Sequence, residues 1–300
     1  MKYALIDMGS NSIRLTVYDV DRDGFRVLFK EKVMAGLAGY VEKGRLSQAG
    51  IACACQSLRL LTDILDALEI ENLSVFATAS LRNVSNTDEA VRQIKENTGL
   101  DVEILSGEEE AECGFYGALH DVQKKDGVFV DIGGGSTELV YFSKNKVQKA
   151  DSISIGSLKL YREYVKKILP GKRARNQLEE AVKNAFQGAF FDTISHCKHL
   201  VCVGGTARAS LRICKRILDL PDECRSITRQ QLKTLADVLC KGDMSAAELI
   251  LRYEPERIHT LIPGLIILRH IAELLDVSDI TVSHYGVREG YLREKIQPYL

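Results

Sequence analysis

Residues Val128–Val140 read VFVDIGGGSTELV, a pattern typical of a β-hairpin with an unusual turn. Val128 to Val130 predict a buried strand because they are β-branched or aromatic, and Leu139 and Val140 begin a second strand. A hairpin turn needs one or two glycines, whereas three in a row lose much backbone entropy on folding. The stretch therefore predicts a turn that another group approaches closely, with a plain glycine-rich turn flanked by surface acids as the alternative.

A phosphate group is the ligand that this turn favours. Successive N–H groups without bulky side chains form a concavity that binds anions. The residues expected to bind phosphate here are Gly133, Gly134, Gly135, Ser136 and Thr137. Asp131 and Glu138 add carboxylates on either side of the turn, and Mg²⁺ prefers oxygen ligands beside phosphate. The hairpin is therefore predicted to hold phosphate together with Mg²⁺ or Mn²⁺.

A second copy of the pattern lies near the start of the sequence. Residues 3–17 read YALIDMGSNSIRLTV, and a shift of 124 positions aligns Asp7 with Asp131. Arg14 falls where Glu138 lies in the other copy. The phosphate-binding residues expected in this copy are Gly9, Ser10, Asn11, Ser12 and Arg14. A self-match at one long offset predicts two related domains, each contributing a phosphate hairpin to a shared cleft.

The paired hairpins resemble the actin, sugar-kinase and Hsp70 superfamily. Further motifs occur in order along the chain: FATASLRN at 76–83, SGEEEA at 106–111, IPG at 262–264 and GVREG at 286–290. Together with the hairpin at 128–140, these motifs resemble the exopolyphosphatase/guanosine pentaphosphate phosphohydrolase (Ppx/GppA) family over nearly all 300 residues. The resemblance implies an α/β protein of two actin-like (ribonuclease H-like) domains around a central cleft. We expect these domains at 1–120 and 121–300, with the last helix packing on the first.

The same resemblance implies the reaction and its participants. The expected reaction is hydrolytic removal of a terminal phosphate from inorganic polyphosphate, in short chains, or from pppGpp. Glu110 is expected to deprotonate the attacking water while Arg82 neutralises charge on the phosphoryl oxygens. The expected metal ligands are Asp131, Glu138 and, through water, Asp7. The expected partners are polyphosphate or guanosine penta- or tetraphosphate and a second copy of the chain, without nucleic acid or membrane.

Local rules explain the neighbours of Glu110 but not Glu110 itself. Ser106 and Glu109 have the spacing of a capping box, and Glu108 complements the helix dipole. Glu110 occupies a position where an apolar residue would pack on Leu105. Its place there is explained only by the family resemblance, which maps the catalytic glutamate to it.

Arg82 follows a strand expected at 73–77. Ligands of open α/β sheets bind beyond the carboxyl ends of strands, so Arg82 is placed to contact phosphate, with a solvated loop arginine as the alternative.

The chain beyond Asp151 is predicted to be mostly helical. The expected helices are Ser157–Leu169, Arg175–Ser195, Thr206–Leu218, Thr228–Cys240, Ser245–Tyr253 and Ile262–Leu275. A strand at 200–203 leads into Gly204 and Gly205, which are similar to the nucleotide-side loop of the superfamily and are expected to bind phosphate. An ordinary strand–helix turn is the alternative.

Composition limits the classes of ligand that the whole chain attracts. The formal net charge is −1, so a polyanion requires a local basic surface. One candidate is the cluster Lys166, Lys167, Lys172, Arg173 and Arg175, for which a solvated face is the alternative. The eight cysteines show no metal-binding spacing and are expected to be buried thiols in a reducing cytoplasm. No apolar run has the length of a membrane helix, and Met1 leads directly into a strand, so a cytoplasmic location is expected.

Two other functions remain open at the level of sequence. One is a kinase of the same superfamily, which would use a substrate-side aspartate as its base, whereas the unexplained carboxylate here is Glu110. The other is a non-enzymatic sensor of pppGpp or ppGpp, for which a water-activating glutamate is unnecessary. The chain is also expected to be a short two-domain form. The stretch at 33–39 lacks the arginine that is usual near this point of the family, which makes the substrate less certain than the reaction.

Overall fold

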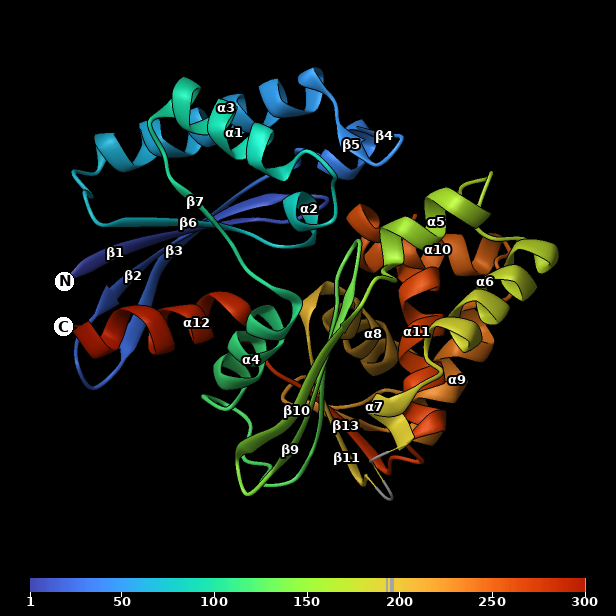
Figure 1. Cartoon of the computed structure of the whole chain (residues 1–300). Coiled ribbons are helices and arrows are strands. Elements are labelled where there is room, and N and C mark those ends of the chain that lie inside the picture. The colour runs from blue at the N-terminus through green and yellow to red at the C-terminus, as the bar shows by residue number, and fades with distance from the viewer. Residues whose placement is uncertain (193, 195–196, 300) are drawn as a thin grey trace. The chain divides into compact units, whose positions relative to one another are not determined.

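The computed structural model describes residues 1–192, 194 and 197–299, which form two compact units (Figure 1). Unit 1 contains Met1–Glu110 together with the end of the chain from Tyr291. Unit 2 contains Ala111–Gly290. Each unit is built on its own β-sheet, with helices packed against it.

Unit 1 has a five-stranded sheet in the order β3-β2-β1-β6-β7. Its strands are β1 (Lys2–Met8), β2 (Ile13–Val20), β3 (Phe25–Val33), β6 (Leu73–Ala77) and β7 (Val102–Ile104). The first three form an antiparallel meander, and β6 and β7 continue parallel to β1. The short strands β4 (Val41–Glu42) and β5 (Arg45–Leu46) form a separate ribbon.

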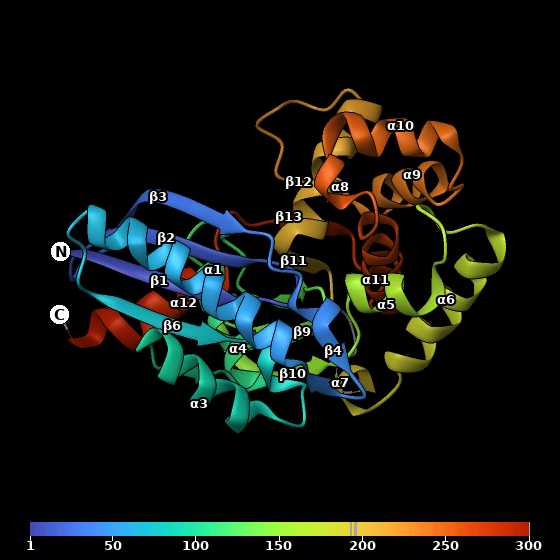
Figure 2. The ribbon, with the colours of Figure 1, turned by 90° about the horizontal axis from the view of Figure 1, so that it is seen from above.

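Helix α1 (Gln48–Ala67) and helix α3 (Thr87–Thr98) lie together on one face of this sheet (Figures 1 and 2). Ser47 caps α1 by accepting a hydrogen bond from the Gly50 N–H, as its position before the apolar repeat predicts. The residues that α1 buries recur at helical spacing, namely Ile51, Ala54, Leu58, Leu61 and Leu65. Each buried leucine contributes about 1.5–3 kcal/mol, so this face accounts for the attachment of the helix.

Unit 2 repeats the arrangement with a sixth strand. Its sheet has the order β10-β9-β8-β11-β13-β12, formed by β8 (Gly127–Ile132), β9 (Thr137–Ser143), β10 (Lys146–Ile153), β11 (His199–Val203), β12 (Ser226–Thr228) and β13 (Asp279–Val282). The first three strands are again an antiparallel meander, followed by β11 and β13 parallel to β8. This repeated order confirms the predicted α/β fold with two related, actin-like sheets. The edge strand β12 was not predicted, because only three residues form it.

The helices of unit 2 surround a central one, α11 (Leu261–Leu274). It packs against α5 (Ser157–Tyr164), α6 (Lys172–Ala185), α8 (Gly204–Ile217) and α9 (Arg229–Leu239). Every residue from Leu261 to Leu268 is buried, which is why α11 is apolar on all sides. Pro263 lies in its first turn, where the missing N–H removes no helical hydrogen bond. Helix α10 (Met244–Tyr253) packs on α8 and α9.

Two predicted helices have wrong boundaries. The helix predicted at Arg175–Ser195 ends at Ala185, and a separate short helix, α7, spans Ala189–Asp192. Gly188 between them has φ of 132°, a conformation that interrupts a helix. Ser195 lies outside the described residues. The helix predicted at Ser157–Leu169 ends at Tyr164, where Val165 is extended.

No helix in the described part of the chain is both long and apolar enough to cross a bilayer.

Candidate functional site

The glycine turn of unit 2 connects β8 to β9. The Gly133 N–H donates to the Ser136 carbonyl at 3.0 Å and closes the turn. The first turn of α5 holds the other side of the loop: the Ser157 N–H donates to the Gly133 carbonyl at 2.9 Å, and the Leu158 N–H donates to the Gly134 carbonyl at 3.0 Å. Backbone carbonyls are thus engaged by α5, while the loop N–H groups belong to a rigid turn of the kind that binds anions.

Gly156, just before α5, is required by this packing. A Cβ atom at Gly156 would lie 2.5 Å from the Gly134 carbonyl carbon and 2.6 Å from the Gly135 nitrogen. The sequence analysis missed this residue because its contact is with a turn 22 positions earlier in the chain. The only signal in the sequence for the role of Gly156 was the short spacing between β10 and α5.

Two carboxylates flank the turn on the same face of the sheet. Asp131 and Glu138 are directly opposite each other in the β8–β9 pair. Glu138 is 1% exposed, and the Ser152 hydroxyl donates to its Oε1 at 2.9 Å. Opposed carboxylates repel, so the arrangement favours a bound cation. Among the described residues, no three His, Cys, Asp or Glu side chains form a complete metal site. The pair therefore fits Mg²⁺, which binds through one or two carboxylates plus substrate phosphates.

Gly204 lies beside the same carboxylates. Val203 pairs with Asp131 in the sheet, and Gly204 begins α8 with φ of 79°. A Cβ atom at Gly204 would lie 2.3 Å from the Asp131 Oδ1. The structure thus places Gly204 next to Asp131, one of the predicted metal ligands.

Gly205 has a different neighbour. A Cβ atom there would lie 1.5 Å from Nη2 of Arg257, which the sequence analysis had not singled out. The nearness of Arg257 to the IPG motif at 262–264 was the one available signal.

The hairpin of unit 1 is closed in the same way. The Gly9 N–H donates to the Ser12 carbonyl at 3.1 Å, the counterpart of the Gly133–Ser136 bond. The segment after β3 packs on the turn, since the Gly36 N–H donates to the Asn11 carbonyl at 2.9 Å and the Ala38 N–H to the Ser10 carbonyl at 2.9 Å.

The side chains of this hairpin also follow the repeat. Asp7 and Arg14 are directly opposite in register, as Asp131 and Glu138 are in unit 2. The Arg14 Nε donates to the Ser12 hydroxyl at 3.1 Å, and the Ser80 hydroxyl donates to the Met8 carbonyl. The predicted equivalence of the two hairpins is therefore visible in their hydrogen bonds.

Arg82 and Glu110 form a partly buried ion pair in unit 1. Arg82 ends the short helix α2 (Ala79–Arg82), which follows β6, so it is not the solvated loop arginine of the alternative. Its Nη1 donates to Glu110 Oε2 at 2.6 Å and to the Leu105 carbonyl at 3.1 Å. The two side chains are 17% and 10% exposed. An ion pair this close and this shielded fixes both groups in position.

The capping box before Glu110 is confirmed. The Ser106 N–H donates to Glu109 Oε2 at 2.9 Å, and the Glu109 N–H donates to the Ser106 hydroxyl at 3.1 Å. The hydrogen bond from the Ser106 backbone lowers the pKa of Glu109, which fits a carboxylate engaged at a helix N-terminus. Helix α4 (Gly107–Ala118) is thus capped without help from Glu110.

The basic cluster at 166–175 is divided by the structure. Lys166, Lys167, Lys172 and Arg173 are exposed, whereas the Arg175 Nη1 donates to the Cys240 carbonyl. Arg175 therefore has a packing role within unit 2. The eight cysteines are free thiols; six of them are buried as predicted, whereas Cys53 and Cys224 are partly exposed.

Comparison with known proteins identifies a matching family and a curated relative. A model of the Ppx/GppA phosphatase family matches residues 16–298. The chain is 26% identical over 314 residues to the bifunctional 3-dehydroquinate synthase/phosphatase of Fusobacterium nucleatum, an alignment that covers 98% of this chain and 46% of that protein. This chain therefore spans about half the length of that curated relative.

Solved structures show the same fold. An exopolyphosphatase from Cytophaga hutchinsonii superimposes with a TM-score of 0.87 at 22% identity, covering 100% of this chain and 99% of the other. The Ppx/GppA family member from Aquifex aeolicus gives 0.80 at 23% identity, covering 100% and 98%. Because the family model spans nearly the whole sequence, the chain belongs to the Ppx/GppA phosphatase family.

Proposed function

We propose that this chain hydrolyses the terminal phosphoanhydride of a short polyphosphate or of pppGpp. The observation that carries the proposal is the duplicated hairpin, closed by the same bond in both units and accompanied in unit 1 by the buried Arg82–Glu110 pair. Hydrolysis of a phosphoanhydride needs mainly positioning and electrostatic stabilisation. Backbone N–H groups, an arginine and a carboxylate meet those needs.

The chain's own residues have distinct roles in this proposal. In the turns at Gly9–Ser12 and Gly133–Thr137, the Gly9 and Gly133 N–H groups close the turns, and other backbone N–H groups of the turns bind phosphoryl oxygens. Arg82 neutralises negative charge on the transferred group, and its ion pair holds Glu110 in place. Glu110 orients the attacking water and accepts its proton, for which a carboxylate fixed at a helix start is suited.

A divalent cation completes the charge balance. Asp131 and Glu138 would hold Mg²⁺ or Mn²⁺, with Asp7 contributing through water. The cation offsets the repulsion between these carboxylates and a polyanionic substrate.

The alternatives to a hydrolase are distinguishable by their products. A kinase of the same superfamily would consume ATP only when an acceptor is present, and a sensor would bind pppGpp without releasing phosphate. The solved relative named an exopolyphosphatase favours the hydrolase for this chain. The buried Glu110 favours it too, since a sensor has no need of a positioned base.

The deciding experiment compares substrates side by side. Phosphate release should be measured with polyphosphates of defined length, with pppGpp, and with ATP in the presence and absence of sugar acceptors. We expect Mg²⁺-dependent release from short polyphosphate or pppGpp and no stimulation by acceptors. Acceptor-dependent ATP consumption would favour the kinase, and binding of pppGpp without any release would favour the sensor.

A further inference from the structure

The segment that joins α5 to α6 exposes an apolar side chain among basic ones. Ile168 in this segment is 62% exposed. Five basic residues and no acidic residue occur from 164 to 178. Four of the five are exposed and make no side-chain hydrogen bond or ion pair with another described residue, namely Lys166, Lys167, Lys172 and Arg173. Residues 166–173 thus form a surface that is both apolar and basic, the basic loop.

Packing fixes the conformation of the basic loop. Val165, just before it, is buried, and Leu169 packs on the core of unit 2. The Tyr161 hydroxyl donates to the Lys167 carbonyl at 3.0 Å. The core of unit 2 therefore covers the neighbours of Ile168 but not Ile168 itself. A loop fixed in this way loses little entropy when it binds a partner.

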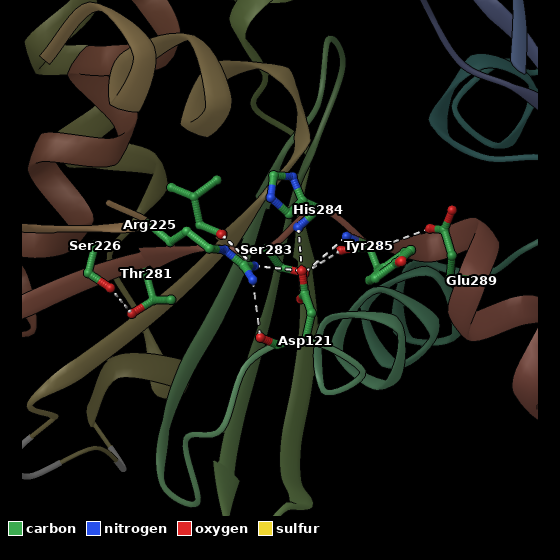
Figure 3. Close-up of polar contacts among 10 residues, drawn as sticks. Asp121, Arg225, Ser226, Thr281, Ser283, His284, Tyr285 and Glu289 are labelled. Carbon is green, nitrogen blue, oxygen red and sulfur yellow. Dashed lines mark hydrogen bonds and ion pairs between the residues drawn. The ribbon is translucent and has the colours of Figure 1, made fainter. Parts of the chain in front are cut away.

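Other basic side chains of unit 2 are already paired. The Arg225 Nη2 donates to Asp121 Oδ2 at 2.5 Å (Figure 3). The Arg212 Nη1 lies 2.7 Å from Glu254 Oε1. The basic loop differs from these arginines, because no ion pair with a described residue neutralises its charge. Its positive charge is therefore available to a partner.

Unit 1 has a surface of the opposite kind. A groove of about 550 Å³ lies between the end of α1, the start of β6 and the end of α3. Its apolar lining consists of Leu65, Ile70, Leu73 and Leu100. Its charged lining consists of Asp66, Glu69 and Glu71, and none of the described residues that line it is basic. These lining residues define the acidic groove.

The acidic groove has an apolar floor and an unpaired acidic rim. Leu65 and Ile70 belong to the core of unit 1 and are 2% and 8% exposed. The three carboxylates are exposed and make no side-chain hydrogen bond or ion pair with another described residue. An apolar centre with a polar rim is typical of protein interfaces. The groove therefore fits a partner that presents an apolar side chain between cations.

We propose that the basic loop of one copy of this chain docks in the acidic groove of a second copy, with Ile168 on the apolar floor. Because the chain itself carries the complementary surface, a second copy is the occupant that the charges favour. The formal net charge of −1 leaves little overall repulsion between copies. Each copy has both surfaces, so a two-fold pair makes the contact twice. Such assembly does not depend on hydrolysis elsewhere in the chain.

Sedimentation velocity of the full chain, over a range of protein and salt concentrations, tests this contact. The loop variant Lys166→Glu/Lys167→Glu reverses two exposed charges of the basic loop. The groove variant Asp66→Lys/Glu71→Lys reverses two exposed charges of the acidic groove. Asp66 lies in the last turn of α1, where a lysine also suits the helix dipole.

We expect the wild type to associate reversibly, and more weakly at high salt because the charges are then screened. Each variant should associate at least about tenfold more weakly, since like charges face each other. An equal mixture of the two variants should recover the association, because a reversed loop then meets a reversed groove. The control Lys146→Glu/Lys233→Glu makes the same change of charge at exposed lysines of unit 2 outside the basic loop and should behave as the wild type.

Ile168→Ser tests the apolar part of the contact. Its side chain is mostly exposed, so the free energy of unfolding should not change, whereas association should weaken at least about tenfold through the lost apolar burial. A wild type that stays monomeric at all concentrations would overturn the proposal. So would loop or groove variants that associate as the wild type does, or a mixture of the two that fails to recover the association.

Discussion

Glu138 is the most buried of the charged residues assigned to the site, at 1% exposed. A carboxylate this buried is costly unless it is hydrogen-bonded or paired with a cation. Ser152 supplies one hydrogen bond, and the opposed Asp131 adds a second negative charge on the same face of the sheet. The hairpin of unit 2 therefore suits the divalent cation that we propose Asp131 and Glu138 hold.

Replacing one of these carboxylates tests that assignment. Asp131→Asn keeps the shape of the side chain but removes its charge, so we expect Mg²⁺ affinity to fall at least about tenfold with little change in folding. Calorimetric titration of Mg²⁺ in the presence of imidotriphosphate measures this. Asp126→Asn, at an exposed position beside β8, is the control. Equal Mg²⁺ affinities for the wild type and Asp131→Asn would remove Asp131 from the metal site.

Among the elements, the start of α5 is what holds the glycine turn of unit 2. Its N–H groups bind the carbonyls of Gly133 and Gly134, and the close approach leaves no room for a side chain at Gly156. The turn is thus positioned by an element that follows it in sequence, across the whole of β9 and β10.

Gly156→Ala should disturb this contact. The added methyl would lie within 2.6 Å of the backbone at Gly134 and Gly135, so the turn must shift. We expect a loss of about 1–3 kcal/mol in the free energy of unfolding, together with reduced phosphate release. Gly171→Ala is the control, because no described atom lies within 4 Å of a Cβ there. Urea unfolding that gives equal stabilities for the two variants would show that the contact is unimportant.

Tyr291, the last residue of α12 (Val287–Tyr291), begins the C-terminal part of unit 1, which a polar cluster holds in place. The Tyr291 ring stacks on Phe76 with centroids 4.8 Å apart, and its hydroxyl donates to Glu103 Oε2 at 2.6 Å. Burial, and then Glu103, raise the pKa of Tyr291. Burial lowers the pKa of Lys295, but the hydrogen bonds and charges of Glu103 and Glu109 together raise it more. Both groups therefore stabilise unit 1 below a pH of about 10, and this contribution is lost as pH rises through their folded-state pKa values.

Tyr291→Phe isolates the tyrosine part of this dependence. The ring stacking remains, but Glu103 loses a donor, so we expect a loss of about 1–2 kcal/mol in unfolding free energy near neutral pH. Above pH about 10 the difference from the wild type should shrink, because only the wild type has a tyrosine to ionise. Urea unfolding at pH 8 and near pH 11 measures both values. A difference that stays constant with pH would contradict the assigned pKa direction.

At the scale of the whole molecule, the sequence predicted those features that depend on residues close together in the chain. The strand pattern and the glycine run at 128–140 predicted the hairpin, and Ser106 with Glu109 predicted a helix cap, because both depend on short-range geometry. The contacts of Gly156 and Arg257 could not be predicted, since they join segments that only the fold brings together. Strand β12 was missed because only three residues form it and its last residue, Thr228, also caps the next helix. The helix break at Gly188 was missed because the apolar spacing continues past it into Phe190.

The central claim, that the chain is a hydrolase using Glu110 as its base, is tested most directly by phosphate release from short polyphosphate by two adjacent variants. Glu110→Gln keeps the side-chain shape but cannot accept a proton, so kcat should fall by about 10²–10⁴-fold while the fold and substrate binding persist. Glu109→Gln should turn over almost normally, because glutamine also closes the capping box with Ser106. If Glu109→Gln is the inactive variant, or if both variants release phosphate at the wild-type rate, Glu110 is not the base and the proposed mechanism is wrong.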